Sequence, residues 1–349
     1  MSTKITIILL TIFTILFGLS FFIIKSVYDS QFKRINRPDP ALTGGIFDYN
    51  EIKESYPRET ISFKSGDNNL AGYLYGLNND KGLIVVVHGL GGGADDYLAQ
   101  IMYFVDSGFK VFAYDSTGCY DSEGDSIKGF PQAVLDLHHA LNYIENSEEL
   151  SNLDILLFGH SWGGYAVSHV LNYEHDITGV VSIAGVNNPN DFISNKAVDM
   201  LGGIGYLFKP FTSLYQSILY GEVASFTAVN GINKSNVPVM VIHGEDDETV
   251  NYKRDSIIIH QEKITNENAI FVTTSGIHGG HSNLFKSEDA LNYINEVNKE
   301  YKDLYYQYNG KIPYDIHKDF YDKLDDELVS KLNDDLMSQI VNFYNNCLN

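Results

Sequence analysis

The most constraining feature of the chain is LDILLFGHSWGG, residues 153–164, where an apolar run leads directly into a glycine-rich turn. A continuous apolar run of this length is typical of a strand buried on both faces of a sheet. The turn carries Gly159, Ser161 and Gly163 at alternate positions. Such spacing is typical of a serine held on a sharp strand-to-helix connection, where close backbone packing leaves no room for a flanking Cβ. Gly-x-Ser-x-Gly also occurs by chance in ordinary turns, so the context decides between the two interpretations.

Strand-like and helix-like segments alternate on both sides of this turn. Strands are predicted at residues 59–64, 70–76, 82–89, 110–115, 153–159, 177–185, 237–244 and 268–276. The first two are predicted to form a hairpin, and helices are predicted between most of the others. This order predicts an α/β fold with a mostly parallel central sheet and helices on both faces.

The alternation breaks between residues 186 and 236. An unstructured loop of that length is unusual in a compact domain, so a small helical cap is predicted there. The segment YLFKPFTSLYQSILY within it is aromatic and apolar. Either its helices pack on the main body, or they line a lipophilic pocket. The predicted α/β domain therefore covers residues 58–349, with a cap insertion at about 186–236.

The N-terminus predicts a membrane anchor. Residues 5–24 contain no charge and are bracketed by Lys4 and Lys25. Twenty helical residues reach about 30 Å, the thickness of a bilayer's hydrocarbon core. A cleaved signal peptide is the alternative, but it usually has a shorter apolar core and a small-residue cleavage site. We therefore expect a single-pass transmembrane anchor at residues 1–25 and a linker at 26–57. The flanking charges favour a cytoplasmic domain only weakly, so the sequence does not decide on which side of the membrane the domain lies.

A serine hydroxyl needs a base to become a nucleophile, and that base needs a carboxylate to orient it. HGEDDETV, after the strand at 237–244, supplies Glu245, Asp246, Asp247 and Glu248. GIHGGHSN, after the last predicted strand, supplies His278 and His281. Both segments follow strands that come after Ser161, so the chain order is serine, acid, histidine.

These motifs resemble those of α/β-hydrolases, in the group of monoacylglycerol lipases, small carboxylesterases and serine aminopeptidase-like proteins. The resemblance runs from about residue 58 to the end and is carried by HGLGGG, YDSTGCYDSEG, GHSWGG, HGEDDETV and GGHSN. It implies the α/β-hydrolase fold and selects Ser161, Asp247 and His281 as catalytic residues. His278 is then expected to be a supporting or exposed residue.

An oxyanion hole follows from the same chemistry, because the tetrahedral intermediate needs two N–H donors for its negative oxygen. The backbone of Trp162, directly after the nucleophile, is expected to supply one of them. Leu90, in the loop after the strand at 82–89, is expected to supply the other. Both are main-chain donors and demand no particular side chain.

The resemblance implies a serine hydrolase that cleaves carboxylic esters, with a small, lipophilic ester as substrate. The apolar N-terminal run adds the expectation that this hydrolase is membrane-anchored, with the lipid bilayer as a partner of the N-terminal helix. Alternatives are a peptidase, thioesterase or acyltransferase with the same catalytic residues, or a non-catalytic binding protein of this fold. An aminopeptidase needs a carboxylate for the substrate amine, and Glu222 is the candidate in the cap. Cys119 is a poor alternative nucleophile, because no base is evident beside it.

Composition excludes other classes. The formal charge of −21 repels phosphate backbones, so no nucleic-acid partner is expected. The two cysteines cannot build a disulfide framework or a cysteine-rich zinc site. The histidines and acidic residues lack metal-site spacings such as His-Glu-x-x-His, so no metal and no cofactor are expected.

Overall fold

The computed structural model describes residues 3–44 and 48–349 and contains an eight-stranded sheet in the order β1-β2-β4-β3-β5-β6-β7-β8. The strands are β1 (Arg58–Ser65), β2 (Asn68–Tyr75), β3 (Leu83–Val87), β4 (Lys110–Tyr114), β5 (Ile155–His160), β6 (Ile177–Ile183), β7 (Val239–Gly244) and β8 (Ala269–Thr274). β2 pairs antiparallel with β1 and with β4, and all other neighbouring strands pair parallel. The predicted hairpin and the predicted mostly parallel sheet are both confirmed.

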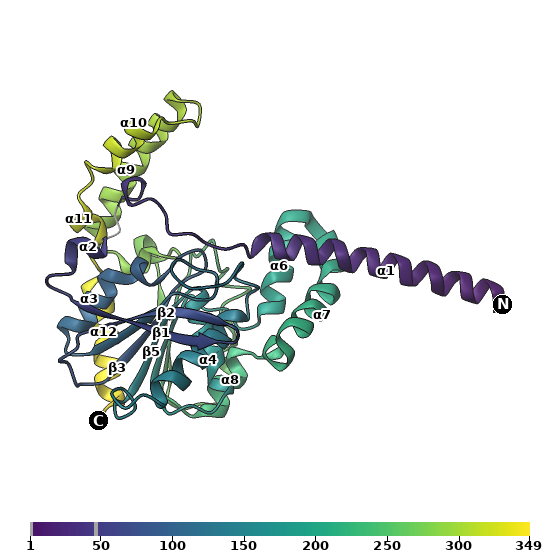
Figure 1. Ribbon diagram of the computed structural model, residues 1–349, viewed down its shortest axis with the longest axis horizontal. Helices are drawn as coiled ribbons and strands as arrows, with labels where there is room; N and C mark the ends of the chain where they lie inside the picture. Colours follow the sequence, from purple (N-terminus) through teal and green to yellow (C-terminus); the bar gives the residue numbers. More distant parts are fainter. Residues whose placement is uncertain (1–2, 45–47) are drawn as a thin grey trace.

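Helices cover both faces of the sheet (Figure 1). The α-helices are α1 (Thr3–Gln31), α2 (Tyr49–Ile52), α3 (Leu98–Asp106), α4 (Gln132–Glu145), α5 (Trp162–His169), α6 (Pro189–Leu201), α7 (Lys209–Tyr220), α8 (Ala228–Ser235), α9 (Glu288–Gln307), α10 (Tyr314–Tyr321), α11 (Asp326–Ser330) and α12 (Asp334–Cys347). The 3₁₀ turns are η1 (Pro40–Leu42), η2 (Ala94–Tyr97), η3 (Val170–Asn172), η4 (Gly202–Phe208), η5 (Gly221–Ser225), η6 (Ile258–Lys263), η7 (Gly276–His278) and η8 (Asn283–Phe285).

Alternate residues of the central strands divide the core into two layers. In β3, Leu83, Val85 and Val87 face the layer formed by α4, α5 and α8. Ile84 and Val86 face the layer formed by α3 and α12. Every residue of β3, β4 and β5 is buried, because a parallel sheet covered on both faces needs apolar side chains on both. This rigid sheet positions the loops at the carboxyl ends of its strands.

The N-terminal region differs from the prediction at its boundary. Helix α1 continues to Gln31, six residues beyond the predicted end at residue 25. The predicted linker also docks on the body: Arg34 donates hydrogen bonds to the backbone carbonyls of Tyr120, Ser122 and Gly124. The sequence carries no signal for this docking, because carbonyl acceptors are independent of side-chain identity.

The predicted cap is helical, and α6, η4, α7, η5 and α8 form it. Helix α1 runs past α6 and α7 and then projects away from the body (Figure 1). The polar stretch after residue 288 forms α9 and α10, which extend from the opposite side as an arm (Figure 1). Helix α12 packs Leu336, Met337 and Ile340 into the core, as its helical spacing predicts.

Candidate active site

Ser161 lies on the predicted sharp turn between β5 and α5. Its backbone has φ 58° and ψ −114°, a strained conformation for a residue with a Cβ. A Cβ on Gly159 would overlap the carbonyl of Gly163, and a Cβ on Gly163 would overlap the carbonyl of Val87. Close backbone packing therefore requires the two glycines, because it leaves no room for a Cβ at either position, as the sequence analysis predicts.

Ser161, His281 and Asp247 lie in one chain of hydrogen bonds. His281 Nε2 is 2.9 Å from Ser161 Oγ, and His281 Nδ1 is 2.7 Å from Asp247 Oδ2. In a neutral imidazole with its proton on Nδ1, Nδ1–H donates to the carboxylate and Nε2 accepts from the hydroxyl. This is the geometry that a general base needs in order to take the proton of Ser161.

Asp247 is the buried member of its acidic run, whereas Glu245, Asp246 and Glu248 are exposed. Its Oδ1 accepts hydrogen bonds from the backbone N–H groups of residues 249 and 250, at 2.8 and 2.7 Å. Burial alone raises the pKa of Asp247, but hydrogen bonds from His243 and His281 outweigh it and hold that pKa well below its usual range. The carboxylate therefore stays ionised beside the imidazole at neutral pH.

His243 is a neighbour of this carboxylate that the sequence analysis missed. Its Nε2 lies 3.1 Å from Asp247 Oδ2 and 2.9 Å from the carbonyl of Val250, and its side chain is fully buried. An Nε2–H shared between two acceptors holds the loop that carries Asp247 against β7. The signal in the sequence is a polar residue at the end of an otherwise apolar strand.

Two side chains hold the two consecutive peptide groups that flank Gly89. His88 Nε2 accepts from the backbone N–H of Ser116 at 3.0 Å, so its Nδ1–H donates to the carbonyl of Gly89 at 2.7 Å. The N–H of Gly89 donates to Tyr97 Oη at 3.1 Å. In a planar trans peptide the carbonyl and the following N–H point in opposite directions, so the Leu90 N–H direction is fixed.

A second histidine connects this loop to the turn that carries His281. His160 Nε2 lies 2.9 Å from the carbonyl of His281, and its Nδ1 lies 2.9 Å from Tyr97 Oη. The carbonyl must accept, so His160 donates through Nε2 and accepts the Tyr97 hydroxyl proton at Nδ1. Burial lowers the pKa of His160 to about 3, which keeps this neutral form at physiological pH.

Replacement of Tyr97 by phenylalanine is expected to lower kcat by about 10-fold or more and to change KM less. The variant leaves the Gly89 N–H and His160 Nδ1 without their shared partner, so the peptide group directly before the Gly89–Leu90 peptide loses its anchor and the Leu90 N–H is held less firmly. The measurement is steady-state hydrolysis of an activated ester, with unfolding followed in parallel. Tyr103→Phe is the matched control, because Tyr103 lies on α3, which follows Tyr97 directly, and its hydroxyl contacts Ser338 away from this network. Equal kcat values for the two variants would contradict the role of Tyr97.

Three further residues named in the sequence analysis are His278, Cys119 and Trp162. His278 is partly exposed, and its Nδ1 faces the carbonyl of Asn283 at 3.4 Å. Burial raises the pKa of the Cys119 thiol, which makes it a poor nucleophile. Trp162 begins α5, where first-turn N–H groups have no acceptor within the helix, and this leaves its N–H free for a ligand.

A cavity of about 380 Å³ opens at Ser161. It is lined by residues 89–92, 95–100, 160–161, 281–282, 285–286 and 330. None of the described residues that line it belongs to the cap, so of the two alternatives for the cap, a pocket lining is not what this cavity shows, and Glu222 lies outside this lining. The arm formed by α9 and α10 contributes no lining residue either. The loop between β3 and α3 forms much of the wall instead.

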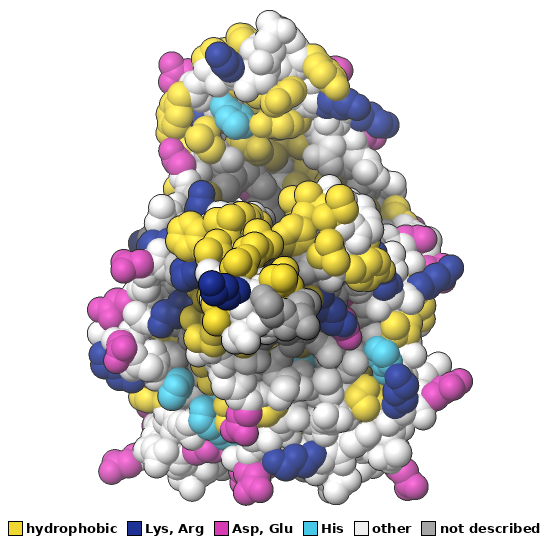
Figure 2. All heavy atoms as spheres, turned by 90° about the vertical axis from the view of Figure 1, so that its right-hand side faces the viewer, with side chains coloured by type: hydrophobic (Ala, Val, Ile, Leu, Met, Phe, Trp, Pro, Cys, Tyr) yellow, Lys and Arg dark blue, Asp and Glu magenta, His cyan; other side chains and the backbone are white. Residues whose placement is uncertain are grey.

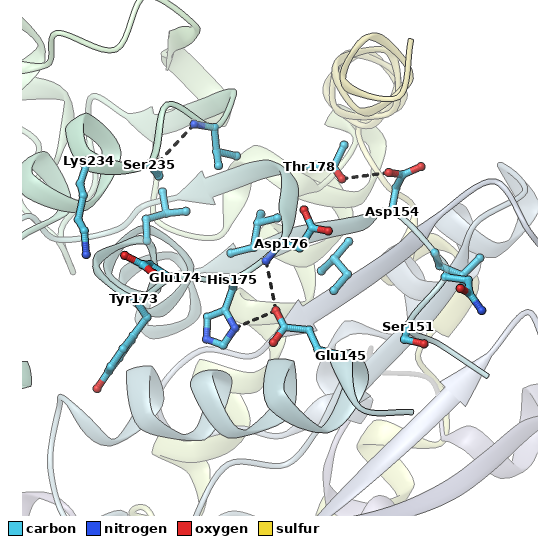
Figure 3. A pocket seen from close by; sticks show the side chains of 16 residues that line it. Glu145, Ser151, Asp154, Tyr173, Glu174, His175, Asp176, Thr178, Lys234 and Ser235 are labelled. Carbon is cyan, nitrogen blue, oxygen red and sulfur yellow. Dashed lines mark hydrogen bonds and ion pairs between the residues drawn. The ribbon is translucent and has the colours of Figure 1, made fainter. Parts of the chain in front are cut away.

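A larger cavity of about 820 Å³ lies near the amino ends of β5 and β6, at the opposite end of the strands from Ser161 (Figure 3). Glu145 accepts hydrogen bonds there from His175 Nδ1, at 2.9 Å, and from the backbone N–H of Asp176. No serine that lines it is hydrogen-bonded to a histidine in the described chain, so the smaller cavity carries the candidate chemistry. Among residues 3–44 and 48–349, no group of three or more His, Cys, Asp or Glu side chains has the arrangement of a metal site.

Comparisons with known proteins agree with this architecture. The family model described as serine aminopeptidase, S33, matches residues 78–217, which contain the Ser161 turn. A proline iminopeptidase of Saccharolobus solfataricus is 30% identical over 118 residues, covering 33% of this chain. The match spans 37% of that relative's own length. A bifunctional esterase/perhydrolase of Acinetobacter calcoaceticus is 25% identical over 218 residues, covering 50% of this chain and 77% of that protein.

Solved structures share the fold. An esterase of Pyrococcus furiosus superposes with a TM-score of 0.53 at 16% identity, covering 78% of this chain and 95% of that one. Est1E of Butyrivibrio proteoclasticus, bound to ferulic acid, gives 0.51 at 18% identity and covers 69% of this chain and 97% of that one. The sheet order and the strand-to-helix turn are those of an α/β-hydrolase. The chain therefore has the α/β-hydrolase fold, and over part of its length its sequence is similar to those of peptidases and an esterase.

Proposed function

We propose that this chain is a membrane-anchored serine hydrolase that cleaves carboxylic esters, with Ser161 as nucleophile, His281 as base and Asp247 as the orienting acid. The observation that carries the proposal is the hydrogen-bonded chain from Ser161 Oγ through His281 to Asp247, beneath an open cavity. The strained backbone of Ser161 adds support, because such strain persists where the surrounding structure enforces it.

In the acylation step, Ser161 Oγ attacks the ester carbonyl carbon and its proton moves to His281 Nε2. The negative oxygen of the tetrahedral intermediate is stabilised by the backbone N–H groups of Leu90 and Trp162. The intermediate collapses as the alkoxide leaves with the proton from His281, and the acyl group stays on Ser161. Asp247 stabilises the transient imidazolium of His281 and keeps a proton on His281 Nδ1.

Deacylation repeats these steps with water. His281 removes a proton from a water molecule, whose oxygen attacks the acyl carbon on Ser161. The second tetrahedral intermediate uses the same two N–H donors. It releases the carboxylic acid as Ser161 regains its proton from His281, so no cofactor is consumed or required.

Helix α1 is the proposed anchor. Its most apolar 18-residue window has a mean hydropathy of 2.8, and 6% of that window is buried. A helix this apolar, and this exposed on the body alone, needs a lipid environment over most of its length. Its second half contacts the cap: Phe17 lies 5.2 Å from Phe211 and Phe21 lies 5.8 Å from Tyr215 between ring centroids. These contacts favour a retained anchor over a cleaved signal peptide, whose loss would expose the facing aromatic rings.

An aminopeptidase is the second candidate, and Asp96 favours it. In the cavity lining, Asp95 is paired with Arg37 and Arg58. The hydrogen-bond donors to the Asp96 carboxylate, within the described chain, are the N–H of Gly93 and the hydroxyl of Tyr120, both neutral. Asp96 could therefore receive the free amine of a peptide substrate, in the role that sequence analysis gave to Glu222.

Two substrate series separate these functions. We expect cleavage of p-nitrophenyl esters. The value of kcat/KM should rise by up to about 4-fold for each added acyl methylene, until the acyl chain is longer than the apolar part of the cavity. We expect weak cleavage of aminoacyl p-nitroanilides, and Asp96→Asn should leave ester hydrolysis within about 2-fold of the parent. Preferred cleavage of anilides that have a free amine, lost in Asp96→Asn, would support the aminopeptidase instead. A preference for the shortest esters would contradict a lipophilic substrate.

A further inference from the structure

We infer that the cap is itself inserted in the membrane: its outer surface lies in the apolar layer of the same bilayer that α1 crosses. The inference rests on the proposed anchoring by α1. It assigns the exposed apolar residues of the cap to a lipid surface and gives the hydrolase a second membrane contact beside the helix.

The contact between α1 and the cap lies inside the apolar run of α1. Phe17 contacts Phe211, and Phe21 contacts Tyr215 edge to face. Both phenylalanines precede Lys25, the first charged residue after Lys4. Lys25 pairs with Asp29, which accepts a hydrogen bond from the hydroxyl of Tyr215 at 2.8 Å. The polar boundary of the apolar run therefore lies on the body's side of the aromatic contacts.

Length then fixes the depth of the cap. The run from residue 5 to residue 24 spans about 30 Å as a helix, the full thickness of a hydrocarbon core. The part ahead of Phe17, residues 5–16, spans only about 18 Å. A bilayer that covers the whole run must therefore also cover the level at which Phe17 and Phe21 touch α7. At that level the cap occupies the space beside α1, so the cap must share the apolar layer.

The cap has the surface that this position requires. We call its exposed, large apolar side chains the cap face; their exposed fractions are Met200 76%, Leu201 52%, Ile204 64%, Tyr206 60%, Leu207 70%, Leu214 40%, Ile218 63% and Leu219 42%. Figure 2 views the molecule from the side to which α1 projects, and hydrophobic side chains gather there around α1 and over the cap. Exposed apolar patches rimmed by polar residues mark membrane or protein contacts. Continuity with the apolar run of α1 favours lipid.

Two ion pairs lie near this face. Lys209 forms an ion pair with Asp191 at 2.5 Å, and Arg254 contacts Asp199 with two hydrogen bonds of 2.8 Å. Paired charges lower the cost of approaching the headgroup layer, where long basic side chains can also extend toward water.

Depth-dependent quenching in the full chain tests the inference. Single cysteines replace Ile204 and Leu207 on the cap face, Leu10 in α1, and Tyr306 on the arm, in a Cys347→Ala background where Cys119 is buried. Each carries an environment-sensitive fluorophore, and the protein is reconstituted in phosphatidylcholine vesicles with nitroxide groups on the acyl chains. Emission at positions 10, 204 and 207 should fall by about 2-fold or more, and emission at 306 should stay unchanged.

The controls separate the possible failures. Quenching at position 10 without quenching at 204 and 207 would overturn the inference and leave the anchor intact. Absence of quenching at position 10 would overturn the anchoring proposal, and the inference with it. A third outcome is that the fluorophores at 204 and 207 report an apolar environment, are not quenched by the acyl-chain nitroxides, and change their emission with protein concentration. That outcome would assign the cap face to a second copy of the chain. None of these readouts depends on hydrolytic activity, so ester specificity can fail independently.

Discussion

Replacing Ser161 by alanine is expected to lower kcat/KM for an activated ester by about 10⁴-fold or more. The variant removes the only atom that forms the acyl intermediate, whereas the two N–H donors and the cavity remain. Initial rates with p-nitrophenyl esters measure the loss. Ser168→Ala is a matched control, because Ser168 lies on the same helix and its hydroxyl bonds the carbonyls of Gly164 and Tyr165. Activity in Ser161→Ala close to that of Ser168→Ala would reject Ser161 as nucleophile.

The strain at Ser161 gives an independent readout. Glycine tolerates positive φ, so Ser161→Gly should be more stable to unfolding than Ser161→Ala by about 1 kcal/mol, although both are inactive. Thermal or denaturant unfolding measures the difference. A Ser161→Ala variant as stable as Ser161→Gly would show that this turn stores no strain, and the support that strain lends to the proposal would be withdrawn.

Replacing Asp247 by asparagine is expected to lower kcat by about 10⁴-fold while the protein stays folded. The amide cannot stabilise an imidazolium, and its N–H₂ group facing His281 Nδ1 would favour the tautomer with its proton on Nε2. That tautomer cannot accept the proton of Ser161. Glu248→Gln is the control, because Glu248 lies next to Asp247 but is exposed. Equal activity in the two variants would show that Asp247 is not the orienting acid.

Asp247 also links stability to pH. Its pKa in the folded protein is lowered by hydrogen bonds from His243 and His281, whereas an unfolded aspartate titrates near 3.9. Its contribution to stability is therefore present above about pH 4 and lost as pH falls below that value. Asp247→Asn should remove this part of the acid dependence of unfolding.

The fold could be predicted from sequence because its determinants are local. Buried parallel strands are continuous apolar runs, as in residues 83–87 and 155–158, and such runs alternate with helical segments along most of the chain. The requirement for Gly159 and Gly163 is likewise local, since it depends on the backbone immediately around Ser161. The selection of Asp247 within its acidic run came from a motif, and its burial distinguishes it from its neighbours in space.

The polar network around the site could not be predicted, because its pairings are tertiary. His160 lies 63 positions from Tyr97, and the chain contains 11 histidines whose partners no local pattern specifies. The sequence left open whether the apolar insertion packs on the main body or lines the pocket, because it holds no signal for the position of the cap. The position of the cap beside α1 is decided instead by aromatic contacts between residues almost 200 positions apart, such as Phe17 and Phe211.

The most direct test is covalent labelling of the full chain with a fluorophosphonate, followed by mass spectrometry of the digested protein. Ser161 Oγ should displace fluoride from phosphorus, so the adduct mass should map to Ser161, and its formation should be strongly slowed in His281→Ala. An adduct on another residue, or complete loss of ester hydrolysis while Ser161 stays unmodified, would contradict the proposed triad.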